Sequence, residues 1–377
     1  MIAVNLLNLF NDKNIDGVGQ YTVNLFKGFN EINEIDKFHF IIRRNSLNFF
    51  SDFINNMEYT LVEEPKFMKY NFYKRDFIAK IYLEQVRLPK ILKELDIDMI
   101  FNPFHSITSY VTNRIPTIVT YHDLLYLNHK EDMSLLKRKF SQNKHSQIVK
   151  RTAFFIVPSQ YVKQDLLNNY PVINEEKVTV LPNPIYLDKN EILEYKVEKN
   201  YILSVNTIAA HKNLITLLKA FYYIKDEIDH NLVLVGKLAR NINSEMRKYI
   251  NKIGKDRLLI TGYVSNSERN YLYKNAALFV SPSLHEGFGM TPIEAAMLNI
   301  PVLTTKVTSL YEVTKGKLDY YDPPDDYKEL AFKILEIIKR ENYNMRNSSY
   351  FYGLYDYRKA AIKYSEFFTL IKKDNCN

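Results

Sequence analysis

Short apolar runs alternate with segments of helical periodicity along nearly the whole chain. The runs are rich in Val, Ile, Leu, Phe and Tyr and occupy residues 2–7, 38–42, 97–102, 117–121, 154–159, 178–183, 201–206, 231–236, 258–264, 277–283 and 301–305. Strands that alternate with helices are typical of parallel βαβ units. The pattern therefore predicts an α/β protein built on parallel sheets.

One charged segment, residues 185–200, has no apolar period, and we interpret it as a linker between two domains. We expect an N-terminal domain over residues 1–187 and a C-terminal domain over residues 198–354, because 377 residues are too many for one ordinary core. A last helix, within residues 355–377, is expected to pack back on the N-terminal domain. Each domain should be a doubly wound, Rossmann-like sheet. The two should face each other across a cleft, with ligands beyond the carboxyl ends of the strands.

The net charge of +8 does not by itself identify a partner, because no nucleic-acid-binding module or arginine-rich tract accompanies it. Part of the excess lies in residues 66–93, where eight Lys/Arg and two Asp/Glu give 8 − 2 = +6 among interleaved aromatic residues. This segment is either a solvated helix face with an aromatic underside or a surface that docks on anionic lipid head groups.

We expect neither a membrane-spanning segment nor a secretory leader. No apolar run reaches the roughly 18 residues that cross a bilayer, and the first residues lack the pattern of a signal peptide. The single cysteine, Cys376, excludes a disulfide within the chain. We therefore expect a cytoplasmic protein, with peripheral contact to the inner face of the membrane as the open alternative.

The loop and helix after the strand at 277–283 are the most informative part of the chain. Gly287 and Gly289 lie on the loop, where glycine lets the backbone approach a ligand closely. We expect a helix with Thr291 as its N-cap, proline at its first position and Glu294 completing a capping box. The N–H groups and the positive dipole end of such a helix favour a diphosphate.

Two carboxylates, Glu286 on the loop and Glu294 in the first turn, are predicted to border one pocket. A carboxylate only accepts hydrogen bonds, so the pair is suited to hold two sets of sugar hydroxyls at a fixed separation. The residues alone leave two other interpretations open. Glu294 caps the helix and does nothing more, or Glu286 is a solvated loop acid.

The same segment resembles the acidic E-x7-E motif of glycosyltransferase family 4, with Glu286 as its first glutamate and Glu294 as its second. Residues 262–283, GYVSNSERNYLYKNAALFVSPS, match the family's usual sequence before this loop. The resemblance implies the GT-B fold and transfer with retention of configuration. It also implies that Glu286 contacts the donor hexose and that Glu294 holds the ribose hydroxyls. Backbone groups would meet sugar or phosphate at Gly287, Phe288, Gly289, Met290 and Thr291.

Residues 201–221 resemble the family's strand, loop and helix that carry a basic phosphate clamp, and Lys212 stands where the family has its lysine. An ammonium group there would offset the charge that develops on a leaving diphosphate. Thr207 stands where many members have arginine, so we expect a donor clamp made by Lys212 and loop backbone. Without the resemblance, Lys212 is a surface lysine at the start of a helix.

Gly17 and Gly19 resemble the family's first glycine loop, where donor phosphate or acceptor approaches the backbone. A dinucleotide-binding fingerprint is the alternative. It is disfavoured because the loop lies about ten residues past the strand and Thr22 stands where the third glycine is expected.

Polar residues that follow strands complete the candidate set. His122 and Asp123 follow the strand at 117–121, and the resemblance implies that His122 contacts the donor sugar or the acceptor. The alternative for His122 is a ring satisfied by local backbone. His105 follows another strand, and we place His105 and Asp123 on the acceptor side. Tyr263, after the strand LLIT, is a candidate for contact with the donor base.

Neither a metal ion nor a cofactor is expected. Asp96 and Asp98 superficially resemble the aspartate pair of metal-dependent transferases, but they lie between a helical pattern and a strand, and we interpret them as a turn. No His/Cys cluster has zinc spacing.

Together these features predict a retaining glycosyltransferase with Glu286, His122 and Lys212 as its catalytic candidates. It would move a hexose from a nucleotide diphosphate-sugar to a glycan or lipid-linked acceptor in surface polysaccharide synthesis. Similarity to mannosyltransferase-like members at residues 17–22, 84–89 and 120–127 favours mannose and the donor GDP-mannose.

Three other functions stay open. A nucleotide-sugar epimerase or a phosphorylase uses the same fold, although no lysine in a pyridoxal-binding context is evident. A catalytically silent nucleotide-sugar-binding protein of a glycan assembly complex is the second. A basic nucleic-acid binder is the third, and its binding to plain duplex would depend on salt.

Overall fold

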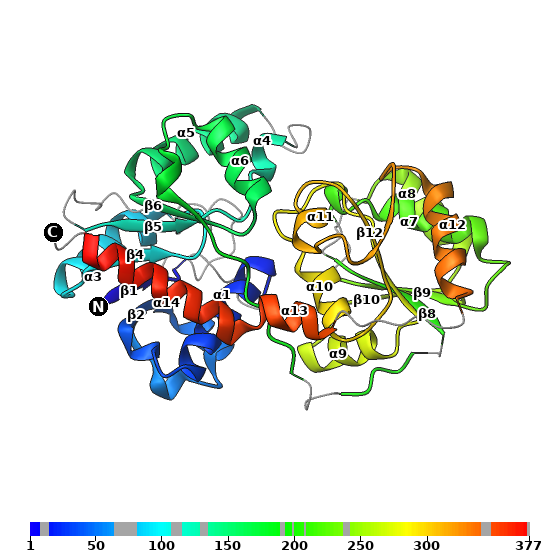
Figure 1. Ribbon diagram of the computed structural model, residues 1–377, viewed down its shortest axis with the longest axis horizontal. Coiled ribbons are helices and arrows are strands. Elements are labelled where there is room, and N and C mark those ends of the chain that lie inside the picture. Colours follow the sequence, from blue (N-terminus) through cyan, green and yellow to red (C-terminus); the bar gives the residue numbers. More distant parts are fainter. Residues whose placement is uncertain are drawn as a thin grey trace. The chain divides into compact units, whose positions relative to one another are not determined.

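The computed structural model describes residues 1–7, 15–63, 81–106, 115–128, 135–188, 193–197, 200–206, 209–236, 242–340 and 348–374. The chain divides into two compact units (Figure 1). Unit 1 comprises Met1–Pro184 and Tyr355–Asn377, and unit 2 is Ile185–Leu354. The segment that we interpreted as a linker begins with residues that belong to unit 2.

The described strands of unit 1 form a seven-stranded parallel sheet in the order β3-β2-β1-β4-β5-β6-β7. They are β1 (Ile2–Asn5), β2 (Phe38–Arg43), β3 (Glu58–Val62), β4 (Met99–Asn102), β5 (Thr117–Thr120), β6 (Phe154–Val157) and β7 (Val178–Val180). The helices are α1 (Gly17–Glu31), α3 (Leu88–Glu94), α4 (Leu125–Asn128), α5 (Leu135–Arg151), α6 (Gln160–Asn169) and α14 (Tyr357–Asp374).

Helices cover both faces of this sheet, because side chains alternate between the faces along each strand. In β1, Ile2 and Val4 belong to the core that contains α1 and α14, whereas Ala3 packs in the core that contains α3. The central strands are therefore apolar on both sides. This explains why their sequences are continuous apolar runs instead of alternating ones.

Unit 2 has a six-stranded parallel sheet in the order β10-β9-β8-β11-β12-β13 among its described residues. Its strands are β8 (Tyr201–Val205), β9 (Asn231–Val235), β10 (Leu258–Gly262), β11 (Leu278–Ser281), β12 (Val302–Thr305) and β13 (Asp319–Tyr321). Its helices are α7 (Leu214–Ile224), α8 (Ser244–Ile253), α9 (Asn266–Lys274), α10 (Met290–Met297), α11 (Leu310–Val313) and α12 (Tyr327–Ile338). Helix α13 (Ser348–Tyr355) lies where the chain returns to unit 1.

Two doubly wound parallel sheets confirm the predicted α/β fold class. Two strands were missed, β3 and β13, and both are edge strands. β3 begins with two exposed residues, and β13 has only three residues. An edge strand is partly open to solvent and does not need the long apolar run on which the prediction depended.

Helix α14 packs against α1 at Gly28, where the two helices come very close. A Cβ atom on Gly28 would overlap the carbonyl oxygen of Tyr357 and lie 2.9 Å from Cβ of Ala361. Nearby, the hydroxyl of Tyr21 donates a hydrogen bond of 3.0 Å to that of Tyr364. The last helix is thus held to unit 1 by close backbone packing and a buried hydrogen bond.

We expect Gly28→Ala to lower the free energy of unfolding by about 1–3 kcal/mol, because the added methyl group must push α14 away from α1. Denaturant-induced unfolding followed by circular dichroism measures the change. Gly353→Ala in α13 is the matched control, since its Cβ would meet nothing within 4 Å. That substitution should raise stability by about 0.5–1 kcal/mol through helix propensity. Equal effects of the two substitutions would contradict the close contact at Gly28.

Candidate functional site

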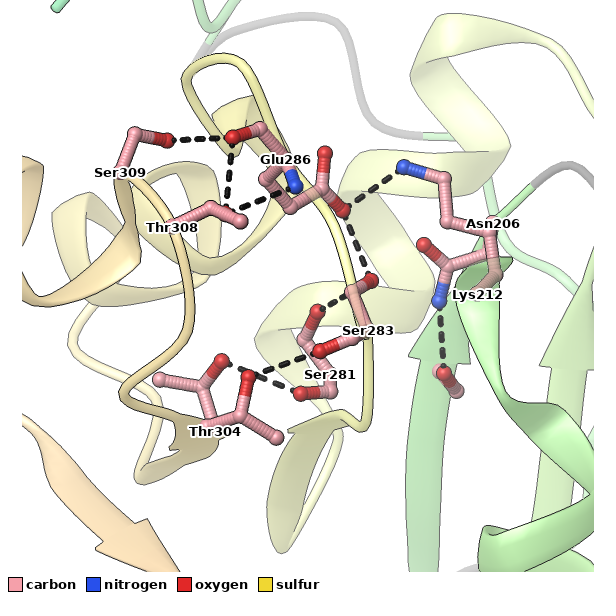
Figure 2. Close-up of polar contacts among 10 residues, drawn as sticks. Asn206, Lys212, Ser281, Ser283, Glu286, Thr304, Thr308 and Ser309 are labelled. Atoms are coloured by element: carbon pink, nitrogen blue, oxygen red, sulfur yellow. Dashed lines mark hydrogen bonds and ion pairs between the residues drawn. The ribbon is translucent and has the colours of Figure 1, made fainter. Parts of the chain in front are cut away.

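Glu286 lies on the loop between β11 and α10, at the carboxyl edge of the sheet in unit 2. Its Oε1 accepts a hydrogen bond from Ser283 Oγ at 2.7 Å and another from Lys212 Nζ at 2.7 Å (Figure 2). The side chains of Glu286 and Lys212 are 11% and 18% exposed. The pair is therefore held by the protein and still reaches solvent, as a ligand-binding ion pair must.

Lys212 ends a 3-10 turn, Ala210–Lys212, between β8 and α7. This turn is tied to the Glu286 loop by a backbone hydrogen bond of 2.8 Å, donated by Leu284 N to His211 O. Because β8 and β11 are neighbours in the sheet, their carboxyl ends bring Lys212 and Glu286 together across 74 positions of sequence. The contact between these two loops at one edge is a direct result of the parallel topology.

Two side chains that the sequence analysis missed hold the backbone of Glu286. Thr308 Oγ1 accepts from Glu286 N at 3.0 Å and donates to Glu286 O at 2.9 Å, and Ser309 Oγ donates to the same carbonyl at 2.8 Å (Figure 2). Thr308 has a φ of 51°, which is rare for a β-branched residue, so these bonds offset backbone strain. Both residues follow β12, and that position after a strand is the signal that could have found them.

Helix α10 begins earlier than predicted. Its first residue is Met290, and its N-cap is Gly289, with φ 84° and no side-chain hydrogen bond to the helix. Thr291 is therefore not the N-cap and Glu294 does not complete a capping box, so this prediction was wrong. Since no N-cap side chain occupies the first turn, its N–H groups and positive dipole end are suited to an anion.

The residues around the start of α10 are more buried than expected for a ligand loop. A Cβ atom on Gly289 would lie 2.5 Å from Cδ2 of Leu310, so the packing of α11 requires glycine here in addition to the positive φ. Phe288 is 4% exposed, and its side chain belongs to the protein interior. Gly287 is also buried, whereas Met290 and Thr291 are half-buried.

Glu294 projects from α10 into a buried cluster with two residues of α9. Its Oε2 accepts a hydrogen bond of 3.0 Å from the hydroxyl of Tyr273, and Oε1 lies 3.7 Å from a terminal nitrogen of Arg269. The side chain of Glu294 is 2% exposed. The pKa of Tyr273 is well above its ordinary value, because burial and the charge of Glu294 both disfavour the phenolate. Tyr273 is therefore a neutral donor that fixes one oxygen of the carboxylate.

Tyr263 follows β10 and is 54% exposed, which leaves its ring available to a ligand. Its contact with the donor base stays a prediction. Thr207 lies outside the described residues, so its predicted place in the donor clamp does too.

In unit 1, His122 is fixed by the turn that follows β4. Its Nε2 donates to the carbonyl of Pro103 at 2.8 Å, and its backbone N donates to Nε2 of His105 at 3.2 Å. Burial lowers the pKa of His122, and it lowers the pKa of His105 to about 3. Both rings are neutral near pH 7. The two histidines are therefore in contact. One ring nitrogen of each is hydrogen-bonded to backbone, that of His122 to Pro103 and that of His105 to His122.

Asp123 has a local role. Its Oδ1 accepts a hydrogen bond of 3.0 Å from the backbone N of Leu125, at the start of the short helix α4. The carboxylate is half-buried, so one oxygen anchors the turn while part of the side chain meets solvent.

Gly17 and Gly19 do not lie on a loop. They form the first turn of α1, whose N-cap is Asp16, and Asp16 Oδ1 accepts from Gly19 N at 2.8 Å. The expectation of a glycine loop before the helix was wrong, because the side chain of Asp16 starts the helix earlier. A carboxylate at this cap also occupies the N–H group that an anionic ligand would use.

The segment 66–93 lies mostly outside the described residues, which resume at Ile81. Asp98 forms an ion pair with Lys372 at 2.7 Å, and this contact lowers the pKa of Asp98.

Within the described ranges, no three His, Cys, Asp or Glu side chains gather as a metal site would require. No helix in that part of the chain is long and apolar enough to cross a membrane.

Two family models match consecutive parts of the chain. The model described as Glycosyltransferase Family 4 matches residues 15–189, and the model described as Glycosyl transferases group 1 matches residues 188–352. The two matches meet close to the division between unit 1 and unit 2.

One relative and two solved structures indicate what the chain is similar to. The O-antigen chain mannosyltransferase RfbU of Salmonella typhimurium is 26% identical over 346 residues, which cover 89% of this chain and 90% of that protein. Sucrose-phosphate synthase from Thermosynechococcus elongatus has a TM-score of 0.75 at 16% identity, over 98% of each chain. Anabaena Alr3699/HepE, solved in complex with UDP and glucose, has a TM-score of 0.72 at 14% identity, over 98% of this chain and 99% of that one. The structural matches confirm the GT-B fold class.

Proposed function

The chain belongs to glycosyltransferase family 4 and is a glycosyltransferase, and from that premise we propose that it transfers mannose from GDP-mannose to a glycan or lipid-linked acceptor, with retention of configuration. The product would be a surface polysaccharide. The hexose rests on similarity to RfbU, whose name records an O-antigen chain mannosyltransferase, and the base rests on the resemblance to mannosyltransferase-like members of the family.

The observation that carries the proposal is the ion pair between Lys212 and Glu286 beside the uncapped start of α10. An acidic acceptor, a cation and a helix N-terminus lie at the carboxyl edge of one sheet. These are the groups that bind, respectively, sugar hydroxyls, diphosphate charge and phosphate oxygens. A donor with a sugar on one side of a diphosphate and a nucleoside on the other matches this set.

In the proposed mechanism Glu286 holds the donor hexose, and Lys212 with the first turn of α10 stabilises the leaving diphosphate. The bond from the anomeric carbon to the diphosphate oxygen breaks while a bond from the acceptor oxygen forms on the same face. The acceptor proton passes to the leaving phosphate. His122 would orient the hexose or the acceptor through its neutral ring. The proposal involves no metal ion, since protein groups carry the charge of the leaving group.

Thermal unfolding in the presence of GDP-mannose, UDP-glucose, UDP-galactose and UDP-N-acetylglucosamine tests the donor assignment. A ligand at about 100 times its Kd should stabilise the folded state by about 2.7 kcal/mol, so we expect a clear rise of Tm with GDP-mannose alone. A rise with a UDP-sugar instead would contradict the choice of base and hexose.

Product analysis then tests catalysis. Hydrolysis of GDP-mannose, or its transfer to an acceptor, with an α-anomeric product would support retention, whereas a β product would contradict it. A donor that binds without any turnover, across both lipid-linked and soluble glycan acceptors, would instead favour a silent nucleotide-sugar-binding protein.

A further inference from the structure

Arg269 lies beside Glu294 and is not explained by the capping or packing of α9. Its side chain is 17% exposed, and a terminal nitrogen is 3.7 Å from Oε1 of Glu294, which is in charge contact but beyond hydrogen-bond range. Its Nε is buried without a hydrogen-bond partner in the described structure. Buried polar atoms without partners are uncommon, and a guanidinium in this state calls for a reason.

Arg269 provides a positive charge next to the buried carboxylate of Glu294. A carboxylate whose side chain is 2% exposed has almost no water to solvate its charge, and buried charges are normally paired with an opposite charge. Arginine stays protonated in proteins, so its guanidinium is a permanent positive charge. Burial acts to lower the pKa of Arg269, but Glu294, Tyr273 and Tyr263 outweigh it and leave that pKa raised. The guanidinium of Arg269 is therefore the charge partner on the Oε1 side of Glu294.

The remaining hydrogen-bond capacity of Glu294 fits a vicinal diol. A carboxylate offers about four lone-pair sites. Tyr273 takes one on Oε2, and Arg269 faces Oε1. Each oxygen keeps capacity for one more donor, which matches two neighbouring hydroxyl groups.

We propose that Arg269 is a positioning residue for donor binding, which orients the carboxylate of Glu294 toward the ribose 2′- and 3′-hydroxyl groups of the nucleotide. This inference rests on the proposed function, in which Glu294 holds the ribose. The Nε atom of Arg269 has no hydrogen-bond partner in the described structure. This agrees with the proposal, because the charge contact with Glu294, and not a complete set of hydrogen bonds, then places the guanidinium.

The test compares the affinities of GDP and UDP with those of their 2′-deoxy forms, by titration calorimetry. Wild-type protein should bind the ribonucleotide of its preferred base about tenfold or more tightly than the deoxy form, as expected for a hydrogen bond to a charged group. In Arg269→Gln this ratio should fall below about twofold. A wild-type ratio in Arg269→Gln would overturn the inference.

Arg257→Gln is the matched control. Arg257 is in the same unit, and one of its terminal nitrogens donates to the carbonyls of Ile228 and His230 at 2.8 Å each. The substitution removes a partly buried guanidinium of structural type, so it should lower stability and leave the ribose ratio unchanged. A loss of the ratio in this control would mean that Arg269→Gln acts through stability alone, which would also overturn the inference.

Glu294→Gln separates failure of the inference from failure of the proposed function. If Glu294→Gln keeps the wild-type ratio, the ribose contact itself is wrong. If Glu294→Gln loses the ratio and Arg269→Gln keeps it, only the role of Arg269 is wrong.

The double variant Arg269→Gln/Glu294→Gln has no unpaired buried charge, so it serves where Arg269→Gln alone fails to fold. Its nucleotide affinity should equal that of Glu294→Gln. A further loss of affinity would show that Arg269 binds the nucleotide directly and would overturn a positioning role.

Discussion

Replacing Glu286 by glutamine is expected to lower kcat/KM by about 10²–10³-fold, the loss typical of removing one preorganised electrostatic group from an active site. The amide keeps the shape of the side chain and an oxygen that accepts from Ser283 and Lys212. It loses the negative charge that binds the hexose hydroxyls and offsets Lys212. The backbone bonds from Thr308 and Ser309 do not involve the side chain, so the loop should keep its conformation. Initial-rate kinetics with the confirmed donor measure the effect.

Glu245→Gln provides the matched control for this substitution. Glu245 forms an ion pair of the same length with Lys219 in the same unit, 2.7 Å between the charged atoms, but its side chain is 51% exposed. Exposed pairs contribute little to stability, and this one joins α7 to α8. Glu245→Gln should leave kcat/KM within about twofold of wild type. Wild-type turnover by Glu286→Gln would show that the Glu286 loop is not the catalytic site.

Replacing Lys212 by methionine is expected to lower kcat by about 10²–10³-fold, because the leaving diphosphate would lose the cation that offsets its developing charge. Methionine preserves much of the apolar stem, so packing should change little. The loss should appear mainly in kcat, since charge on the diphosphate grows in the transition state. Single-turnover kinetics at saturating donor measure this. Lys219→Met, which breaks the pair with Glu245, is the control and should behave as wild type.

The double variant Glu286→Gln/Lys212→Met distinguishes two roles of the lysine. If Lys212 stabilises the diphosphate directly, its removal should slow Glu286→Gln further by a comparable factor. If it only holds Glu286, the double variant should equal Glu286→Gln, which would contradict the assignment of Lys212 to the leaving group.

The architecture could largely be predicted from the sequence, because a strand buried on both faces of a parallel sheet must be a continuous apolar run. Each predicted run corresponds to a strand, and the family and fold class that the acidic segment indicated are confirmed. The edge strands β3 and β13 were not predicted, because they are partly exposed to solvent and have no long apolar run. The sequence placed Lys212 and Glu286 after strands, and the structure shows that these strands, β8 and β11, are neighbours whose carboxyl ends bring the two residues together.

What the sequence determined by itself is therefore the set of properties that depend on local pattern: where the strands run, which edge of each sheet carries polar residues, and which residues begin the loops there. Tertiary structure alone decided where α10 begins, because Gly289 takes a left-handed conformation against Leu310 from a later helix. It also decided the surroundings of Glu294, which meets Arg269 and Tyr273 only because α9 and α10 pack together. Burial and charge contact arise between segments distant in sequence, and no local period encodes them.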